Sequence, residues 1–322
     1  VSWLRGVRSV EQLQSTPGNL RARTKVLGDV IDSSPTFVGA PVSGTLPDSF
    51  ADALYSNASI PESATGAQSY SAFVTAQTGR TNMVYVGAND GFLHGFEAGS
   101  YDSSGNYVST NNDGKELLGY LPSGLLTGSK LVNLTSPVYT HDFYVDATPG
   151  VGDLFYGNAW HTWLVGGVGP SGSEIYALDI ADPGSFSEAN ASSLVKGDWL
   201  GGSTALSHLG QTVGTPVIAR MHNGQWAIIF GNGLGSGASA GVYSGLVDST
   251  SGAVTFQFLD TKIGSSTSAN GIAYVTSADL DGDHIVDYLY AGDLQGNVWR
   301  FDVTSKNTNS WSVSKYGANG SA

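Results

Sequence analysis

Short alternating runs of apolar and polar residues, separated by glycine-containing turns, recur along this chain. The clearest run covers residues 84–97, where two alternating segments flank Gly91, and residues 289–302 repeat the pattern around Gly296 without a gap. Alternation with a period of two on both sides of a glycine predicts a β-hairpin, because glycine can adopt the positive φ that a tight turn requires. The pattern therefore predicts strand, turn and strand at both places.

Two looser copies of this hairpin, at residues 163–180 and 226–248, lie between the two clear ones. Each of the four hairpins follows a further strand-like segment, and these segments cover residues 29–38, 145–149, 212–219 and 271–277. Three of them contain Ser-Pro or Thr-Pro, and proline in a sheet is confined to edges and strand ends. Four modules of three or four strands each predict an all-β fold, in which β-propeller blades stack to bury their faces.

The segments outside this repeat are expected to be connections. Residues 9–12 match the capping box that precedes a helix. Residues 42–80 and 99–137 are rich in Ser, Gly, Asn and Ala, and we expect them to be insertions with short helices on one rim, where binding loops would lie. We divide the chain into a helical or extended lead-in, a β-propeller domain and a frayed or truncated tail, at residues 1–26, 27–303 and 304–322.

Composition supports many short strands and excludes several functions. The chain has 44 Gly and 15 Tyr, but only 13% charged residues and no Cys, so disulfides, thiol catalysis and Cys-ligated zinc are excluded. With a net charge of −13 and 14 Lys and Arg residues, binding to nucleic acid or to an anionic membrane is not expected. The chain contains no apolar run of about 18 residues, so no membrane-spanning segment is predicted. Because the chain begins at Val1 without a signal peptide, we expect a processed or excised fragment.

Four aspartates near the C-terminus carry the strongest chemical signal. Asp279, Asp281, Asp283 and Asp287 occupy positions 1, 3, 5 and 9 of an EF-hand-like loop, and Ile285 would supply its backbone carbonyl at position 7. A ligand set made only of oxygen favours Ca²⁺ or Mg²⁺ over zinc or copper. We therefore predict a calcium site, placed in an elaborated turn between the first two strands of the last module.

Two positions of this loop depart from the EF-hand pattern. Position 6, usually Gly, is His284, and position 12, usually a bidentate Glu, is Tyr290. Histidine is among the residues found at positive φ, so the turn is possible but strained. We expect a calcium affinity on the order of micromolar or weaker. The alternative is a solvated acidic turn that binds no ion.

No catalytic signature is present. Residues 237–241 match the nucleophile elbow around Ser239, but a glycine-rich loop precedes them and no helix is expected after them. The six histidines show no metal-binding spacing and are expected to be satisfied polar residues; they are His94, His141, His161, His208, His222 and His284. Trp163, Trp226 and Trp299 recur at module positions, which favours a role in the blade core over sugar stacking. We predict that the chain is not an enzyme.

Several short motifs occur in an order that resembles a known family. They lie at residues 3–6, 20–23, 27–35, 84–91, 94, 120–122, 144–146, 279–287 and 292–302. Together they resemble the C-terminal domain of the PilY/PilC proteins, the tip-associated adhesins and assembly factors of bacterial type IV pili. The resemblance extends from residue 3 to residue 303.

This resemblance implies a modified seven-bladed propeller related to quinoprotein propellers. It also implies a calcium site in one blade, whose occupancy governs pilus extension against retraction, and hence twitching motility. The implied partners are pilus subunits or minor pilins at the pilus tip, and host-surface ligands. The implied location is the cell surface, at the pilus tip or outer membrane, for an exported bacterial protein. Family members continue past the last blade found here, so closure of the ring stays open.

Two other functions are compatible with a propeller. A quinone-dependent dehydrogenase would need a cofactor bed, commonly with a ring of vicinal cysteines, and a calcium ion at the central channel. This chain has no Cys, and its predicted calcium loop lies in an inter-strand turn. A lectin-like surface binding module remains the third possibility.

Overall fold

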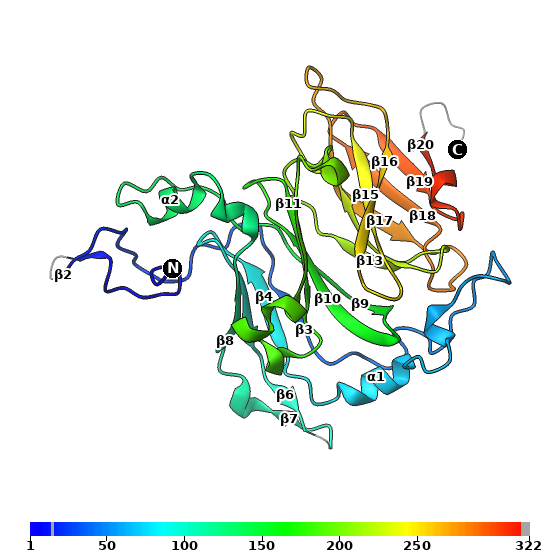
Figure 1. The fold of residues 1–322 in the computed structure, drawn as a ribbon, viewed down its shortest axis with the longest axis horizontal. Coiled ribbons are helices and arrows are strands. Elements are labelled where there is room, and N and C mark those ends of the chain that lie inside the picture. Colours follow the sequence, from blue (N-terminus) through cyan, green and yellow to red (C-terminus); the bar gives the residue numbers. More distant parts are fainter. Residues whose placement is uncertain (14–15, 103, 317–322) are drawn as a thin grey trace.

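Four antiparallel sheets of four strands each form the body of the protein (Figure 1). The computed structural model describes residues 1–13, 16–102 and 104–316. The all-β prediction is confirmed, and each predicted module contains four strands that follow one another in chain order across its sheet. Within the described residues the four sheets do not close into a ring.

The first sheet contains β3 (Thr36–Val38), β4 (Met83–Gly87), β5 (Leu93–Glu97) and β8 (Glu116–Tyr120). The second contains β9 (Gly150–Tyr156), β10 (Ala159–Gly167), β11 (Glu174–Asp179) and β12 (Val195–Leu200). The third contains β13 (Val217–Arg220), β14 (Trp226–Gly231), β15 (Gly241–Val247) and β16 (Val254–Asp260). The fourth contains β17 (Ile272–Ala278), β18 (Tyr288–Asp293), β19 (Val298–Asp302) and β20 (Ser312–Tyr316).

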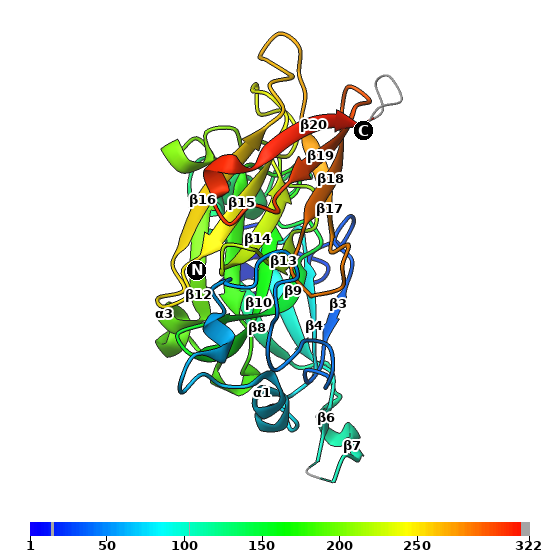
Figure 2. The same cartoon turned by 90° about the vertical axis from the view of Figure 1, so that its right-hand side faces the viewer.

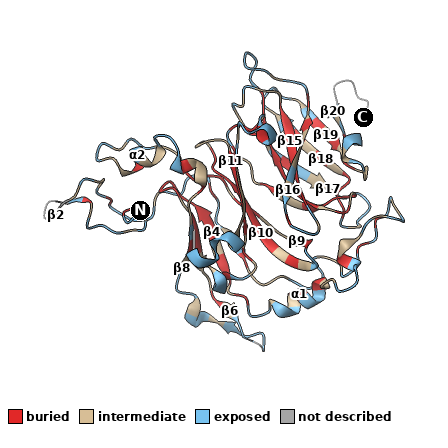
Figure 3. Ribbon diagram, viewed as in Figure 1, coloured by how far each residue is buried: buried red, intermediate tan, exposed pale blue. Residues whose placement is uncertain are grey.

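Strand alternation sends neighbouring residues into different cores. In β10, Trp163 and Val165 join the core between the second and third sheets, whereas Leu164 joins the core between the first and second. In β14, Ile228 and Ile229 divide in the same way between the two cores on either side of the third sheet. Each fully buried side chain of this kind contributes about 1.5–3 kcal/mol. Figure 3 shows that buried residues concentrate in the central strands, whereas the helices and loops are mostly exposed.

Glycines at the ends of equivalent strands allow the sheets to approach closely. Gly87 ends β4, and a Cβ there would lie 2.5 Å from the carbonyl oxygen of Val145, which leads into the second sheet. Gly231 ends β14, and a Cβ there would collide with the carbonyl oxygen of Ile272 in β17. The missing side chain at these positions lets the inner edge of one sheet contact the backbone of the next.

The lead-in and the insertions contain the shortest elements. β1 (Gln12–Leu13) pairs with β2 (Thr16–Pro17), and β6 (Ser100–Tyr101) pairs with β7 (Tyr107–Val108). The α-helices are α1 (Tyr70–Ala76), α2 (Lys130–Thr135) and α3 (Ala191–Leu194). The 3-10 helices are η1 (Pro61–Ser63), η2 (Ser109–Asn111), η3 (Ser123–Leu126), η4 (Pro183–Ser185), η5 (Glu188–Asn190), η6 (Thr204–Leu206) and η7 (Thr308–Ser310). Within the described part of the chain, no helix has the length and apolar character needed to cross a membrane.

The helix predicted after residues 9–12 does not form, so this prediction was wrong. The segment instead leads into β1. In a capping box the side chain of Gln12 would turn back to Ser9, but Gln12 instead begins β1, and its neighbour Glu11 is fully buried and accepts a hydrogen bond of 2.8 Å from Nε of Arg23. A tertiary ion pair therefore overrides the local capping signal, and a short strand forms where the helix was expected.

Two further expectations about the connections need correction. Residues 116–120, placed within an insertion, form β8, and residues 312–316, placed in a tail, form β20; both are the outermost strands of their sheets. The insertions also do not share one rim. α1 and the β6–β7 hairpin lie at the lower edge in both views, whereas α2 projects from the upper left in Figure 1 (Figures 1 and 2). Residues 317–322 of the expected tail lie outside the described residues.

Candidate metal centre

The aspartate-rich loop joins β17 to β18, which confirms its predicted place as an inter-strand turn. The backbone N–H of Asp287 donates to the carbonyl of Ala278 at 3.0 Å, and that of Val286 donates to the carbonyl of Arg220 at 2.9 Å. The Ile285 side chain is fully buried in the core between the second and third sheets. These contacts fix the C-terminal half of the loop against the neighbouring sheet.

Three of the predicted ligands lie together. Asp279, Asp281 and Asp283 each offer a carboxylate oxygen, and these oxygens lie within 4.8 Å of one another. Asp279 and Asp281 are exposed, and Asp283 is half-buried. Among the residues that the structure describes, this trio is the cluster of acidic side chains with the spacing of a metal site.

The backbone of the loop wraps around the Asp279 carboxylate. Its Oδ1 accepts the N–H of Gly282 at 2.7 Å, and its Oδ2 accepts the N–H of His284 at 2.8 Å. This tight turn requires left-handed backbone at two residues, Gly282 with φ 80° and His284 with φ 67°. The predicted positive φ at His284 is confirmed.

Negative charges crowd one another around Asp281. Slight burial, followed by the charges of Asp283 and Asp287, raises the pKa of Asp281 above its usual value. A divalent cation bound among these oxygens would remove this repulsion. Hard oxygen donors, several of them carboxylates, are the chemistry that Ca²⁺ accepts, so the residues present fit this ion.

Asp287 stays a predicted ligand, and its carboxylate already has partners within the protein. It is buried, its Oδ2 accepts the N–H of Leu280 at 2.7 Å, and its Oδ1 lies 3.1 Å from Nε2 of His222. Nδ1 of His222 in turn lies 2.9 Å from Oδ2 of Asp52. The sequence predicts only that His222 is a satisfied polar residue, and no local pattern connects Asp52 with the loop. The carbonyl of Ile285 remains a predicted ligand.

The alternative catalytic signals gain no support from the structure. Ser239 lies in a loop that leads directly into strand β15, so the helix that a nucleophile elbow requires is absent at this place. Four of the histidines pair with carboxylates, and these are His94, His141, His161 and His222. Trp163, Trp226 and Trp299 are buried in the cores, as predicted.

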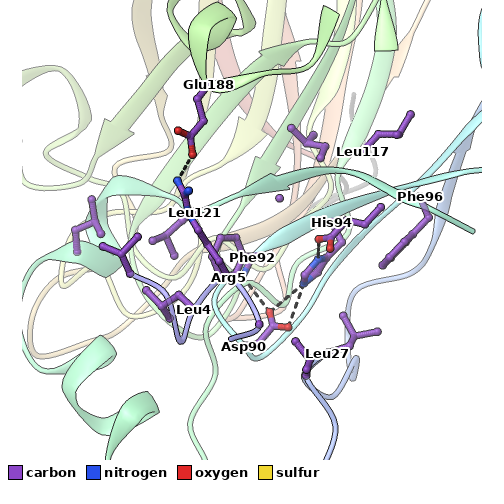
Figure 4. A pocket seen from close by; sticks show the side chains of 17 residues that line it. Leu4, Arg5, Leu27, Asp90, Phe92, His94, Phe96, Leu117, Leu121 and Glu188 are labelled. Atoms are coloured by element: carbon purple, nitrogen blue, oxygen red, sulfur yellow. Dashed lines mark hydrogen bonds and ion pairs between the residues drawn. The ribbon is translucent and has the colours of Figure 1, made fainter. Parts of the chain in front are cut away.

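A cavity of about 760 Å³ lies between the lead-in and the outer face of the first sheet (Figure 4). Its lining is mostly apolar, with Leu4, Leu27 and Phe92 among the apolar side chains, and it includes the ion pair of Arg5 with Glu188 and an ion cluster around His94. In this cluster, Nδ1 of His94 lies 2.6 Å from Oε1 of Glu116, and Nε2 lies 3.1 Å from Oδ1 of Asp90. Burial alone would lower the pKa of His94, but the two carboxylates outweigh it and raise the pKa to about 9.

We expect this cluster to make stability depend on pH between neutrality and pH 10. The folded pKa of His94 exceeds its unfolded value, so its stabilisation is fully present below about pH 6.5 and is lost as the pH rises through about 9. Glu116 is half-exposed, so water screens part of the interaction, and roughly 1–2 kcal/mol is expected. Urea denaturation should show His94→Gln to be less stable than the wild type at pH 6 and nearly equal at pH 10. A difference that does not change with pH would contradict this prediction.

Comparison with known proteins places this arrangement in a family. A family model described as the PilY1 beta-propeller domain matches residues 27–322. The chain is 37% identical over 312 residues to the type IV pilus biogenesis factor PilY1 of Pseudomonas aeruginosa (strain PAK), covering 96% of this chain and 23% of that protein. It is 34% identical over 316 residues to a type IV pilus biogenesis factor PilY1 homolog of Xylella fastidiosa (strain Temecula1 / ATCC 700964), covering 97% of this chain and 22% of that protein.

A solved structure agrees with these matches. The crystal structure of the Pseudomonas aeruginosa PilY1 C-terminal domain superposes with a TM-score of 0.56 at 31% sequence identity, covering 83% of this chain and 51% of that chain. Of the two curated full-length relatives named above, the chain spans less than a quarter of the length. By the family model and by its relatives, this chain belongs to the PilY1 β-propeller domain family.

Proposed function

We propose that this chain is the calcium-binding β-propeller of a type IV pilus biogenesis factor. This proposal rests on the trio Asp279, Asp281 and Asp283, whose carboxylate oxygens lie within 4.8 Å of one another in an elaborated turn of a PilY1-family propeller. Calcium at this loop would regulate pilus extension against retraction, and the protein would support surface adhesion. Its partners would be minor pilins at the tip of the pilus, on the cell surface or outer membrane.

We also propose that the four sheets are blades of a seven-bladed ring in a longer protein. The outer face of the fourth sheet supports this, because Tyr274, Val298 and Tyr316 are exposed on it. Gly292 has the same place in β18 that Gly87 has in β4, yet the nearest atom to a Cβ there is 3.9 Å away. A further blade would meet this face as the second sheet meets the first.

Calcium is expected to raise the melting temperature of the protein relative to a chelator. At free calcium tenfold above Kd, binding to the folded state alone adds about 1.4 kcal/mol. Asp281→Asn should abolish this shift, because it removes one charge from the trio. Asp248→Asn, in an exposed turn of the third sheet, is the matched control and should retain the shift. Equal melting curves with calcium and with EGTA would refute the calcium site.

The pilus role has a separate test in a bacterium that carries this protein. A cell whose own gene encodes Asp281→Asn should change its surface piliation or its twitching motility. If piliation and motility in that strain equal those of the wild type, calcium has only a structural role and does not regulate the pilus.

A further inference from the structure

Between β3 and β4, the inserted segment contacts the second and third sheets and the aspartate-rich loop of the fourth. We call residues 50–62 the strap; it belongs to the blue segment at the lower right of Figure 1. Its first residue, Phe50, packs edge-on against Trp226 of the third sheet, with ring centroids 6.1 Å apart. Near its end, Glu62 accepts a hydrogen bond of 2.9 Å from Nε of Arg220. Both ends of the strap are thus anchored in the protein interior.

The middle of the strap contacts the aspartate-rich loop. The backbone N–H of Ala53 donates to Oδ2 of Asp283 at 2.8 Å, across 230 positions of sequence. The Asp52 carboxylate reaches Asp287 through His222, whose two ring nitrogens lie 2.9 Å and 3.1 Å from these acids. The side chains of Asp52 and His222 are fully buried. Two of the four predicted carboxylate ligands are therefore held by the strap or through it.

Asp52 also shapes the strap itself. Its Oδ1 accepts the backbone N–H groups of Leu54 and Tyr55, each at 2.9 Å. The Tyr55 ring packs edge-on against His222, at 5.8 Å between centroids. Beyond these contacts the middle of the strap is exposed, with Leu54 49% accessible. Segments with few buried contacts open locally at low cost, so the order of this segment depends on the loop beneath it.

We infer that the strap is a positioning element of the calcium loop and that its docking is coupled to calcium. This inference rests on the calcium site proposed above. Donors that hold ligating carboxylates set their orientation, and their loss typically costs 10–100-fold in metal affinity. Ala53 holds Asp283 in this way, and the pair of Asp52 and His222 holds Asp287. Coupling is reciprocal, so calcium must stabilise the docked strap as much as the docked strap favours calcium.

The first experiment uses the unmodified protein. Amide hydrogen exchange is measured by mass spectrometry on peptides covering residues 52–58, in calcium and in EGTA. Exchange in these peptides should slow at least severalfold in calcium, whereas peptides from β10 should not change. Equal exchange of the 52–58 peptides in both conditions, with calcium bound, would overturn the inference.

The second experiment uses calorimetric titration with calcium. Asp52→Ala should lower calcium affinity at least tenfold, and Asp52→Asn should restore part of it, because the amide oxygen still accepts from the strap backbone. Asp248→Ala is the matched control, since Oδ1 of Asp248 likewise accepts two backbone N–H groups, those of Thr250 and Ser251, in an exposed turn of the third sheet, and it should bind like the wild type. If the wild type binds no calcium, the proposed function fails. If the wild type and Asp52→Ala bind equally, only the inference fails.

Discussion

Glu62→Gln is expected to lower the free energy of unfolding by about 3–5 kcal/mol. Glu62 and Arg220 form an ion pair whose side chains are only 1% and 0% exposed. Oε1 of Glu62 also accepts the indole N–H of Trp226 at 2.8 Å. Glutamine keeps an acceptor oxygen but removes the charge, so the Arg220 guanidinium stays buried without a counterion. Urea denaturation of the purified protein measures the loss.

Two controls separate the buried charge from a general effect of the substitution. Glu188 pairs with Arg5 at the surface, where the side chains of Glu188 and Arg5 are 79% and 60% exposed. Glu188→Gln removes this pair and should lower the free energy of unfolding by less than about 1 kcal/mol. The double change Glu62→Leu with Arg220→Met removes both charges and should be less destabilising than Glu62→Gln alone. If Glu62→Gln and Glu188→Gln cost the same, the buried pair does not hold the strap as argued.

The inner hairpins were predictable because their strands are buried on one or both faces. Residues 84–97 contain most of β4, a turn and β5, and residues 289–302 contain most of β18, a turn and β19. Strong apolar alternation and a turn glycine are local signals, and the hairpins that they predict are retained in the folded protein. The outermost strands β8 and β20 were missed because β8 is partly exposed, β20 is mostly exposed, and both carry few apolar residues in alternation.

The loop was predicted from local spacing, but its surroundings were not. The positive φ of His284 follows from its place in a short motif. The contacts of Asp52 and His222 join residues 170 positions apart, and no local pattern records such a pairing. The same reason explains the error at residues 9–12, where Glu11 pairs with Arg23. Long-range pairing of buried polar groups is the part of this fold that the sequence does not display.

Gly231→Ala is expected to destabilise the protein by about 3 kcal/mol, at the upper end of the cost of overpacking. A Cβ at this position would collide with the Ile272 carbonyl oxygen and lie 2.7 Å from Cγ2 of the same residue. The obstacle includes rigid backbone of β17, and the carbonyl of Ile272 also accepts the N–H of Gly233 at 2.8 Å. The third and fourth sheets would have to separate, which would weaken the core between them.

Gly292→Ala is the matched control, because Gly292 is exposed near the end of the equivalent strand β18 and a Cβ there meets nothing closer than 3.9 Å. Its free energy of unfolding should stay within about 0.5 kcal/mol of the wild type. Thermal and urea denaturation of both variants measure the difference. Equal stability of the two variants would show that close backbone approach between sheets does not require glycine. A large loss for Gly231→Ala alone would show that the repeat places glycine where one sheet meets the next.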